Sequence, residues 1–225
     1  WSFFPEAGTD PFRTSKKDAP TPVCAGASFL LSQEEYTMSF FVQSDAKINI
    51  SLRVTGKRPD GYHELRSVFL RLSAVESLTI TTQYDHNVRN NLSIHGEAVP
   101  GKNILEEVLA RAGRTMNVPP LHISLAKNIP PGSGLGGGSG NAAALLSWLH
   151  RISGKSDPGP GEFGSDVPFL FSDAEWASVG GRGEIVTPVD SPPETPAVLV
   201  AVPTWEMSTQ RAFSLLDEAC GGRFP

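Results

Sequence analysis

Cysteine is scarce in this chain: Cys24 and Cys220 lie far apart, and neither has a close-spaced partner. A zinc site of clustered cysteines and a disulfide framework are therefore excluded, and a reducing, cytoplasmic environment is expected. Long apolar runs are also missing, because the longest covers only residues 197–202, whereas a membrane-spanning helix needs about 20 residues. The formal net charge of −5 lacks the basic excess typical of nucleic-acid-binding proteins. The sequence thus predicts neither a membrane nor a nucleic acid as a partner.

The chain has the size and composition of a globular protein of one or two domains. It contains 225 residues, of which 39% are hydrophobic and 19% charged. A chain of this length can bury a large core without a covalent staple. Residues 1–37 are interrupted by prolines, show no periodic pattern and are left unassigned.

Strict alternation of apolar and polar residues over 46–54 predicts a β-strand with one buried face. Lys47 and Asn49 share the polar face of this strand. A turn-rich loop follows at 56–65. The face expected to be buried carries Ile48, Ile50, Leu52 and Val54.

Further periodic segments predict a mixture of strands and helices. Asn103 is expected to cap a helix, because Glu106 follows three residues later as in a capping box. Strands and helices alternate irregularly, which favours an α+β fold over a doubly wound sheet. The expected strands are 77–82, 91–95, 121–126 and 197–202, and the expected helices are 103–112, 139–152 and about 208–219.

A glycine-rich loop lies between the predicted strand at 121–126 and the helix that follows it. Five of the seven residues in 132–138 are glycine, and Ser133 and Ser139 add hydroxyl groups. Glycine lets the backbone approach a ligand closely, and a helix N-terminus attracts anions, so the loop is a candidate phosphate cradle. A flexible surface loop is the alternative. A Walker A motif is excluded for this loop, because its glycines are not followed by a Gly-Lys pair with Ser or Thr next to it.

The segment 130–144 resembles the ATP loop of the GHMP kinase superfamily, and its triple glycine resembles one family within it, the 4-diphosphocytidyl-2-C-methyl-D-erythritol kinases. Other segments resemble the same family in the same order, and together the matches cover about 38–217. These segments are AKINISL at 46–52, GKRPDGYHEL at 56–65, GSDVPF at 164–169, GRGE at 181–184 and PTWEMSTQRAF at 203–213.

The resemblance implies the GHMP kinase fold, an α+β architecture. Residues 38–190 are expected to form its N-terminal domain, which is like ribosomal protein S5 and binds ATP, and residues 191–225 the start of its C-terminal α+β domain. Three departures stand out: Gly140 replaces a second Ser, the stretch before Gly164 is short, and the third, C-terminal motif is absent. The chain is therefore expected to be partial.

Two charged residues are candidates for catalysis. From its context alone, Asp166 would be a helix cap and Lys47 a solvated strand residue. The resemblance instead makes Asp166 the catalytic base and Lys47 the cation beside it and the transferring phosphate. In isolation, Arg182 and Glu184 are read as residues that stabilise a turn.

The resemblance also assigns binding residues. His63 would read the cytosine edge, Tyr62 and Phe213 would stack on the ring, and Asn49 and Asp166 would contact the substrate. ATP is the implied co-substrate, and Mg²⁺ is expected with it, with no metal ligands assigned. The residues implied for ATP are Asn103, Lys127, Pro130, Pro131, Gly132, Ser133, Gly134, Leu135, Gly136, Gly137, Gly138, Ser139 and Gly140.

The implied activity is a kinase that phosphorylates the 2-hydroxyl of 4-diphosphocytidyl-2-C-methyl-D-erythritol in the non-mevalonate isoprenoid pathway. Two alternatives stay open. A nucleotide-binding module without turnover would fit the missing third motif, although it would need neither Lys47 nor Asp166. Another GHMP kinase, for mevalonate or homoserine, would not need the segment 61–65, because those substrates carry no cytosine. The sequence does not predict an oligomeric state.

Overall fold

The structure is a computed structural model that describes residues 37–83, 89–194, 197–201, 208–221 and 224. The chain divides into two units, Trp1–Glu35 and Tyr36–Pro225, and all the described residues lie in the second. The unassigned segment 1–37 lies almost entirely outside the described residues. In the part of the chain that is described, no helix is long and apolar enough to cross a membrane.

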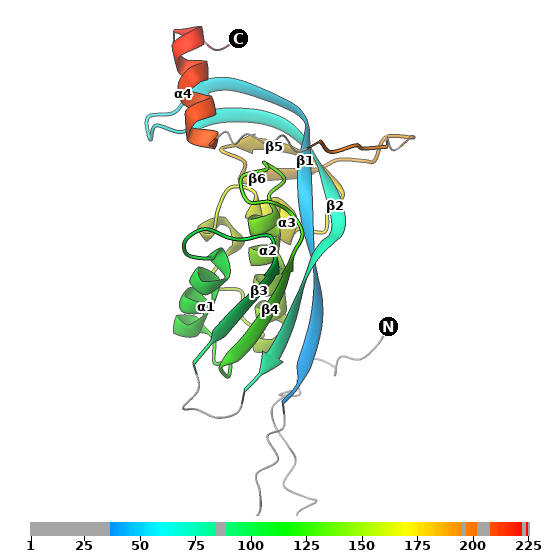
Figure 1. Ribbon diagram of the computed structural model, residues 1–225. Coiled ribbons are helices and arrows are strands. Elements are labelled where there is room, and N and C mark those ends of the chain that lie inside the picture. Colours follow the sequence, from blue (N-terminus) through cyan, green and yellow to red (C-terminus); the bar gives the residue numbers. More distant parts are fainter. Residues whose placement is uncertain (1–36, 84–88, 195–196, 202–207, 222–223, 225) are drawn as a thin grey trace, which may run out of the picture. The chain divides into compact units, whose positions relative to one another are not determined.

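A six-stranded sheet within the second unit provides the frame for the site (Figure 1). Its central strand β2 pairs antiparallel with β1 along most of its length, with β4 at its C-terminal half and with β5 at its N-terminal half. β3 pairs parallel with β4, and β6 pairs antiparallel with β5. The strands are β1 (Ser39–Lys57), β2 (His63–Thr82), β3 (Asn91–Gly96), β4 (Leu121–Lys127), β5 (Trp176–Gly181) and β6 (Ile185–Pro188).

Three of the described helices, α1, α2 and α4, begin and end close to where the sequence predicts them, whereas the short α3 was not predicted. Asn103 caps α1 as expected: its Oδ1 accepts from Leu105 N at 2.9 Å, and Glu106 Oε2 accepts from Asn103 N at 3.1 Å. Ser208 caps α4 by accepting from Arg211 N at 3.2 Å. The helices are α1 (Ile104–Thr115), α2 (Gly137–Ser153), α3 (Val167–Phe171) and α4 (Thr209–Cys220), with a 3₁₀ turn at Pro160–Glu162.

One hydrophobic core joins α1 and α2 to the sheet, and it fixes the ends of β4 and α2 that flank the glycine loop. Alternate residues of β4 are buried, as are the residues of both helices at helical spacing. The mixed strand and helix layers confirm the α+β prediction. The fully buried members of this core include Ile80, Leu105, Val108, Leu121, Ile123, Leu125, Leu145, Leu146 and Leu149.

The expected burial of β1 is wrong, although the strand itself is confirmed. Ile50 and Leu52 are 46% and 53% exposed, whereas Lys47 is only 6% exposed. The pairing register of β1 and β2 shifts between Asn49 and Ser51, and each such irregularity interrupts the period of two. The strand also extends beyond the core, so alternation alone could not say which half is covered.

Two further strand predictions need correction, and some strands were missed. Residues 197–201 form no strand, and Leu199 is 95% exposed; an apolar run becomes a strand only when a neighbouring strand pairs with it. Residue 202 lies outside the described residues. The expected strand 77–82 is only the end of β2, which begins at His63, and neither β5 nor β6 was predicted.

Candidate functional site

The glycine loop connects β4 to α2 and turns sharply where the helix begins. The N-cap residue Gly136 has φ +70°, and a Cβ there would lie 3.3 Å from Lys47 Cγ and 3.5 Å from Asp166 Oδ2. Only glycine fits this close approach in a left-handed conformation. No side chain caps α2, so the N–H groups of its first turn are left for a ligand at the positive end of the helix dipole.

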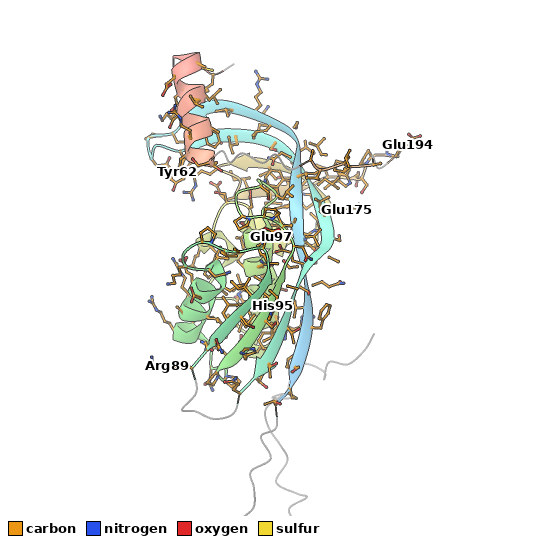
Figure 2. The ribbon with its side chains drawn as sticks, viewed as in Figure 1. Tyr62, Arg89, His95, Glu97, Glu175 and Glu194 are labelled. Carbon is orange, nitrogen blue, oxygen red and sulfur yellow. The ribbon has the colours of Figure 1, made fainter. Side chains whose placement is uncertain are left out.

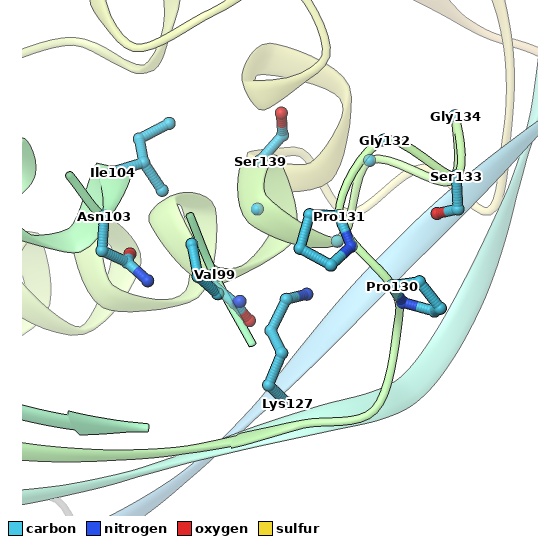
Figure 3. A pocket seen from close by; sticks show the side chains of 14 residues that line it. Val99, Asn103, Ile104, Lys127, Pro130, Pro131, Gly132, Ser133, Gly134 and Ser139 are labelled. Atoms are coloured by element: carbon cyan, nitrogen blue, oxygen red, sulfur yellow. The ribbon is translucent and has the colours of Figure 1, made fainter. Parts of the chain in front are cut away.

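A pocket of about 310 Å³ opens beside this helix end (Figure 3). It lies between the glycine loop, the end of β4 and the start of α1. Among the predicted ATP residues, only Leu135 and Gly140 are not part of its lining. The lining residues are Val99, Asn103, Ile104, Lys127, Pro130, Pro131, Gly132, Ser133, Gly134, Gly136, Gly137, Gly138, Ser139 and Asn141.

Leu135 and Gly140 serve the packing of the loop instead. The carbonyl of Leu135 accepts a hydrogen bond from Lys47 N at 2.8 Å. A Cβ at Gly140 would lie 1.8 Å from the backbone oxygen of Asp45, so glycine is required for α2 to approach β1 this closely. The departure from the family's second Ser therefore has a steric reason.

Lys47 and Asp166 meet beneath the glycine loop, although 119 residues of sequence separate them. Lys47 Nζ lies 3.6 Å from Asp166 Oδ2 and donates to Gly134 O at 2.8 Å. The ammonium also lies 5.1 Å from the centre of the Phe69 ring. Asp166 precedes α3 but makes no side-chain capping bond, so the cap alternative receives no support from its geometry.

Asn49 shares the face of Lys47, as predicted, and supports its ammonium. Asn49 Oδ1 accepts from Lys47 Nζ at 2.8 Å, while Asn49 Nδ2 donates to Ser67 Oγ at 3.0 Å. The amide orientation is thereby fixed by one donor and one acceptor. A contact from Asn49 to a substrate stays a prediction.

A buried ion pair that the sequence interpretation missed borders the pocket. Glu76 Oε1 accepts from Lys127 Nζ at 2.6 Å and from the backbone N–H groups of Asn128 and Ile129 at 3.0 and 2.7 Å. Glu76 is fully buried on its side chain, and Lys127 is 5% exposed. A signal existed, because Glu76 is in register with the buried residues Leu78 and Ile80 of the same strand. A buried carboxylate at such a position needs a partner.

The predicted cytidine residues gather where the β1–β2 turn meets α4. Phe213 stacks on His63 with ring centres 4.5 Å apart, and His63 Nε2 lies 2.7 Å from Asp217 Oδ1. Tyr62 lies at this turn (Figure 2), and the guanidinium of Arg182 lies 4.6 Å from the centre of its ring. Arg182 N also donates to Glu184, in keeping with a turn-stabilising role.

The Asp217 carboxylate holds α4 against this turn. Hydrogen bonds from Lys57, at 2.6 Å, and from His63 lower the pKa of the Asp217 carboxyl below its ordinary value. A lowered pKa means that the contact contributes stability above the ordinary pKa of aspartate and loses it as pH falls through the folded-state value. The Asp217 carboxyl is therefore ionised throughout the neutral pH range.

These features define the class of protein. Residues 102–158 match the family model described as GHMP kinases N terminal domain, and the fold with its glycine loop is that of a GHMP kinase. A solved structure of 4-(cytidine 5'-diphospho)-2C-methyl-D-erythritol kinase is 31% identical, with a TM-score of 0.52 over 69% of this chain and 56% of that chain.

Relatives narrow the class to one family. The chain is 35% identical to the 4-diphosphocytidyl-2-C-methyl-D-erythritol kinase of Nitratidesulfovibrio vulgaris, over 79% of this chain and 64% of the relative. It is 34% identical to the enzyme of that name from Methylacidiphilum infernorum, over 84% and 67%. A chloroplastic relative from Oryza sativa is 36% identical over 71% and 42%. The chain belongs to the 4-diphosphocytidyl-2-C-methyl-D-erythritol kinase family, and it spans about two thirds of the length of the bacterial relatives.

Proposed function

We propose that this protein transfers the γ-phosphoryl group of ATP to the 2-hydroxyl of 4-diphosphocytidyl-2-C-methyl-D-erythritol, a step of non-mevalonate isoprenoid biosynthesis. One observation carries the proposal: the Lys47 ammonium contacts both the carboxylate of Asp166 and the carbonyl of Gly134 in the glycine loop. A proton acceptor, a cation and a phosphate cradle are thereby gathered in one place. Phosphoryl transfer needs positioning and charge neutralisation of this kind rather than covalent catalysis.

Each group has a role in this mechanism. In this proposal the free N–H groups at the start of α2 bind the phosphates of ATP. Asn103 and Lys127, which line the same pocket, are proposed to contact its nucleoside. Asp166 accepts the proton of the substrate hydroxyl as the phosphoryl group transfers. Lys47 offsets the charge that develops on the transferring group.

Mg²⁺ is expected to accompany ATP. The described residues contain no group of three or more His, Cys, Asp or Glu side chains that could hold a metal ion. Mg²⁺ is commonly held by one or two carboxylates together with phosphates and several waters. No carboxylate is assigned to the metal here, because Asp166 is already the proposed proton acceptor and Glu76 is engaged by Lys127. The metal would neutralise phosphate charge.

We also propose a domain boundary and a cellular compartment. The boundary lies at residue 190, between an ATP-binding domain and the start of a second domain. The compartment is a reducing one such as the cytoplasm, which the scarcity of cysteine supports.

A nucleotide-binding module without turnover is the competing function, and two measurements separate it from the kinase. Titration with a non-hydrolysable ATP analogue is expected to perturb the backbone amides of residues 132–140 in either case. Release of ADP that depends on added 4-diphosphocytidyl-2-C-methyl-D-erythritol is expected only for the kinase. Unperturbed amides would contradict both functions. Binding without substrate-dependent release of ADP would contradict the kinase and support the nucleotide-binding module.

Replacing His63 by Ala is expected to weaken binding of the cytidine substrate more than binding of ATP. The ring contacts Phe213 and Asp217, and His63 is not among the residues that line the phosphate pocket. Isothermal titration with each ligand measures the two affinities. Lys57→Ala is the matched control, because it weakens the hold on Asp217 and leaves the imidazole in place. Equal losses for both ligands would argue against the cytidine assignment.

A further inference from the structure

Arg71 makes a set of contacts that no role assigned so far explains. It lies on β2 directly opposite Lys47 of β1, and its side chain is 11% exposed. A guanidinium has five N–H donors, and five hydrogen bonds leave the three nitrogens of Arg71. Its acceptors are Asp45 Oδ2 at 2.7 Å, Phe169 O at 2.8 Å, Ala174 O at 2.9 Å, Leu170 O at 3.1 Å and Ser172 O.

Four of these acceptors belong to the end of α3 and the turn after it. The helix Val167–Phe171 has only five residues, and a helix this short is not stable by itself. The last carbonyls of any helix lack hydrogen-bond donors within the helix. Here Arg71 donates to the carbonyls of Phe169 and Leu170. The guanidinium also lies 5.2 Å from the centre of the Phe169 ring. Arg71 therefore fixes the short helix whose first turn follows Asp166.

The fifth acceptor lies on the strand that carries Lys47. Asp45 precedes Lys47 by two residues, next to the register shift between Ser44 and Ala46. Its other carboxylate oxygen accepts from Ala74 N at 2.8 Å. One largely buried guanidinium thus joins the Lys47 segment of β1 to the helix that follows Asp166.

We propose that Arg71 is a positioning residue that sets the placement of Asp166 relative to Lys47. The proposal rests on the proposed function, because it assumes that the two side chains act on one phosphoryl group. Among the described residues, the side-chain contacts of Arg71 reach neither the pocket lining nor the predicted substrate residues, so it acts through α3 and β1. A lysine at this position would keep the charge and lose the planar fork that reaches several acceptors at once.

Arg71→Lys is expected to lower kcat by about 10–100-fold while KM for ATP changes less than about twofold, since a displacement of about 1 Å in a catalytic group can cost 10²-fold. Arg111→Lys is the matched control. Arg111 also binds carboxylates, Glu107 at 2.8 Å and Glu162 at 3.0 Å, and lies 5.5 Å from the Phe163 ring centre, away from the site. The control should leave kcat within about twofold of wild type, because Arg111 shares no partner with Lys47 or Asp166. Its exposed ion pairs should lower the melting temperature only slightly.

Two further readouts keep the test decisive. Hydrogen exchange of the peptide covering residues 165–173 should speed up in Arg71→Lys and not in Arg111→Lys, whether or not the protein phosphorylates any substrate. If Arg71→Lys does not fold, Asp45→Asn replaces it, with a smaller fall in kcat at unchanged KM. Unchanged exchange at 165–173 overturns the proposal, as does faster exchange with an unchanged kcat in an active enzyme. Absence of activity in the wild type contradicts the proposed function alone.

Discussion

Asp166→Asn is expected to lower turnover by about 10²–10⁴-fold, the usual range for a positioned proton acceptor. The amide has the shape of the carboxylate but cannot accept the hydroxyl proton. The fold should survive, because Asp166 makes no side-chain capping bond and its side chain is partly exposed. Affinity for the substrate should change little, since the lost interaction operates in the transition state. Steady-state kinetics and melting temperatures measure both effects.

The matched control is Asp173→Asn, at an aspartate just beyond the other end of α3. Its turnover should stay within about twofold of wild type, as for an ordinary surface substitution. A lower melting temperature with nearly normal turnover in Asp166→Asn would return Asp166 to the role of a helix cap.

Lys47→Met is expected to cause a loss of the same order. Methionine has similar length but cannot donate to Gly134 O, to Asn49 Oδ1 or to a phosphate oxygen. The charge opposite Asp166 disappears, and charge on the transferring group is no longer offset. Lys155→Met is the control, because that exposed lysine also donates to a backbone carbonyl, Thr115 O. Neither Lys155 nor Thr115 lines the pocket beside the glycine loop.

The two substitutions should not multiply when combined. Residues that act as one unit lose most of their joint effect when either is removed, so the double variant should be little worse than the worse single variant. Single-turnover rates of both single variants and the double variant give the coupling directly. Strictly multiplicative losses would mean that Lys47 and Asp166 work independently, even if each is essential.

Local patterns predicted much of the fold. The capping box at Asn103, the strand before the glycines and the helix after them depend on residues close together in the sequence, and the structure confirms all three. Residues 130–141 contribute ten of the fourteen residues that line the pocket, and they meet Val99, Asn103 and Ile104 only because the end of β4 and the start of α1 lie beside the loop. The family resemblance added Lys47 and Asp166, which no local pattern connects.

Long-range contacts limited the prediction elsewhere. The bonds from Arg71 to the end of α3 span about 100 residues, and the bond from Lys127 to Glu76 spans 51. No local sequence pattern predicts which residue Arg71 or Lys127 contacts. The exposure of Ile50 and Leu52 depends on a register shift and on where the core ends, and alternation carries no information about either.

The most direct measurement is ³¹P NMR of a reaction that contains the protein, ATP, Mg²⁺ and 4-diphosphocytidyl-2-C-methyl-D-erythritol. The wild type should produce a new phosphomonoester resonance in equal amount to ADP, with the diphosphate of the substrate intact. Asp166→Asn should produce it far more slowly. No phosphomonoester, or ATP converted only to ADP and inorganic phosphate, would contradict phosphoryl transfer to the substrate at the Lys47–Asp166 site.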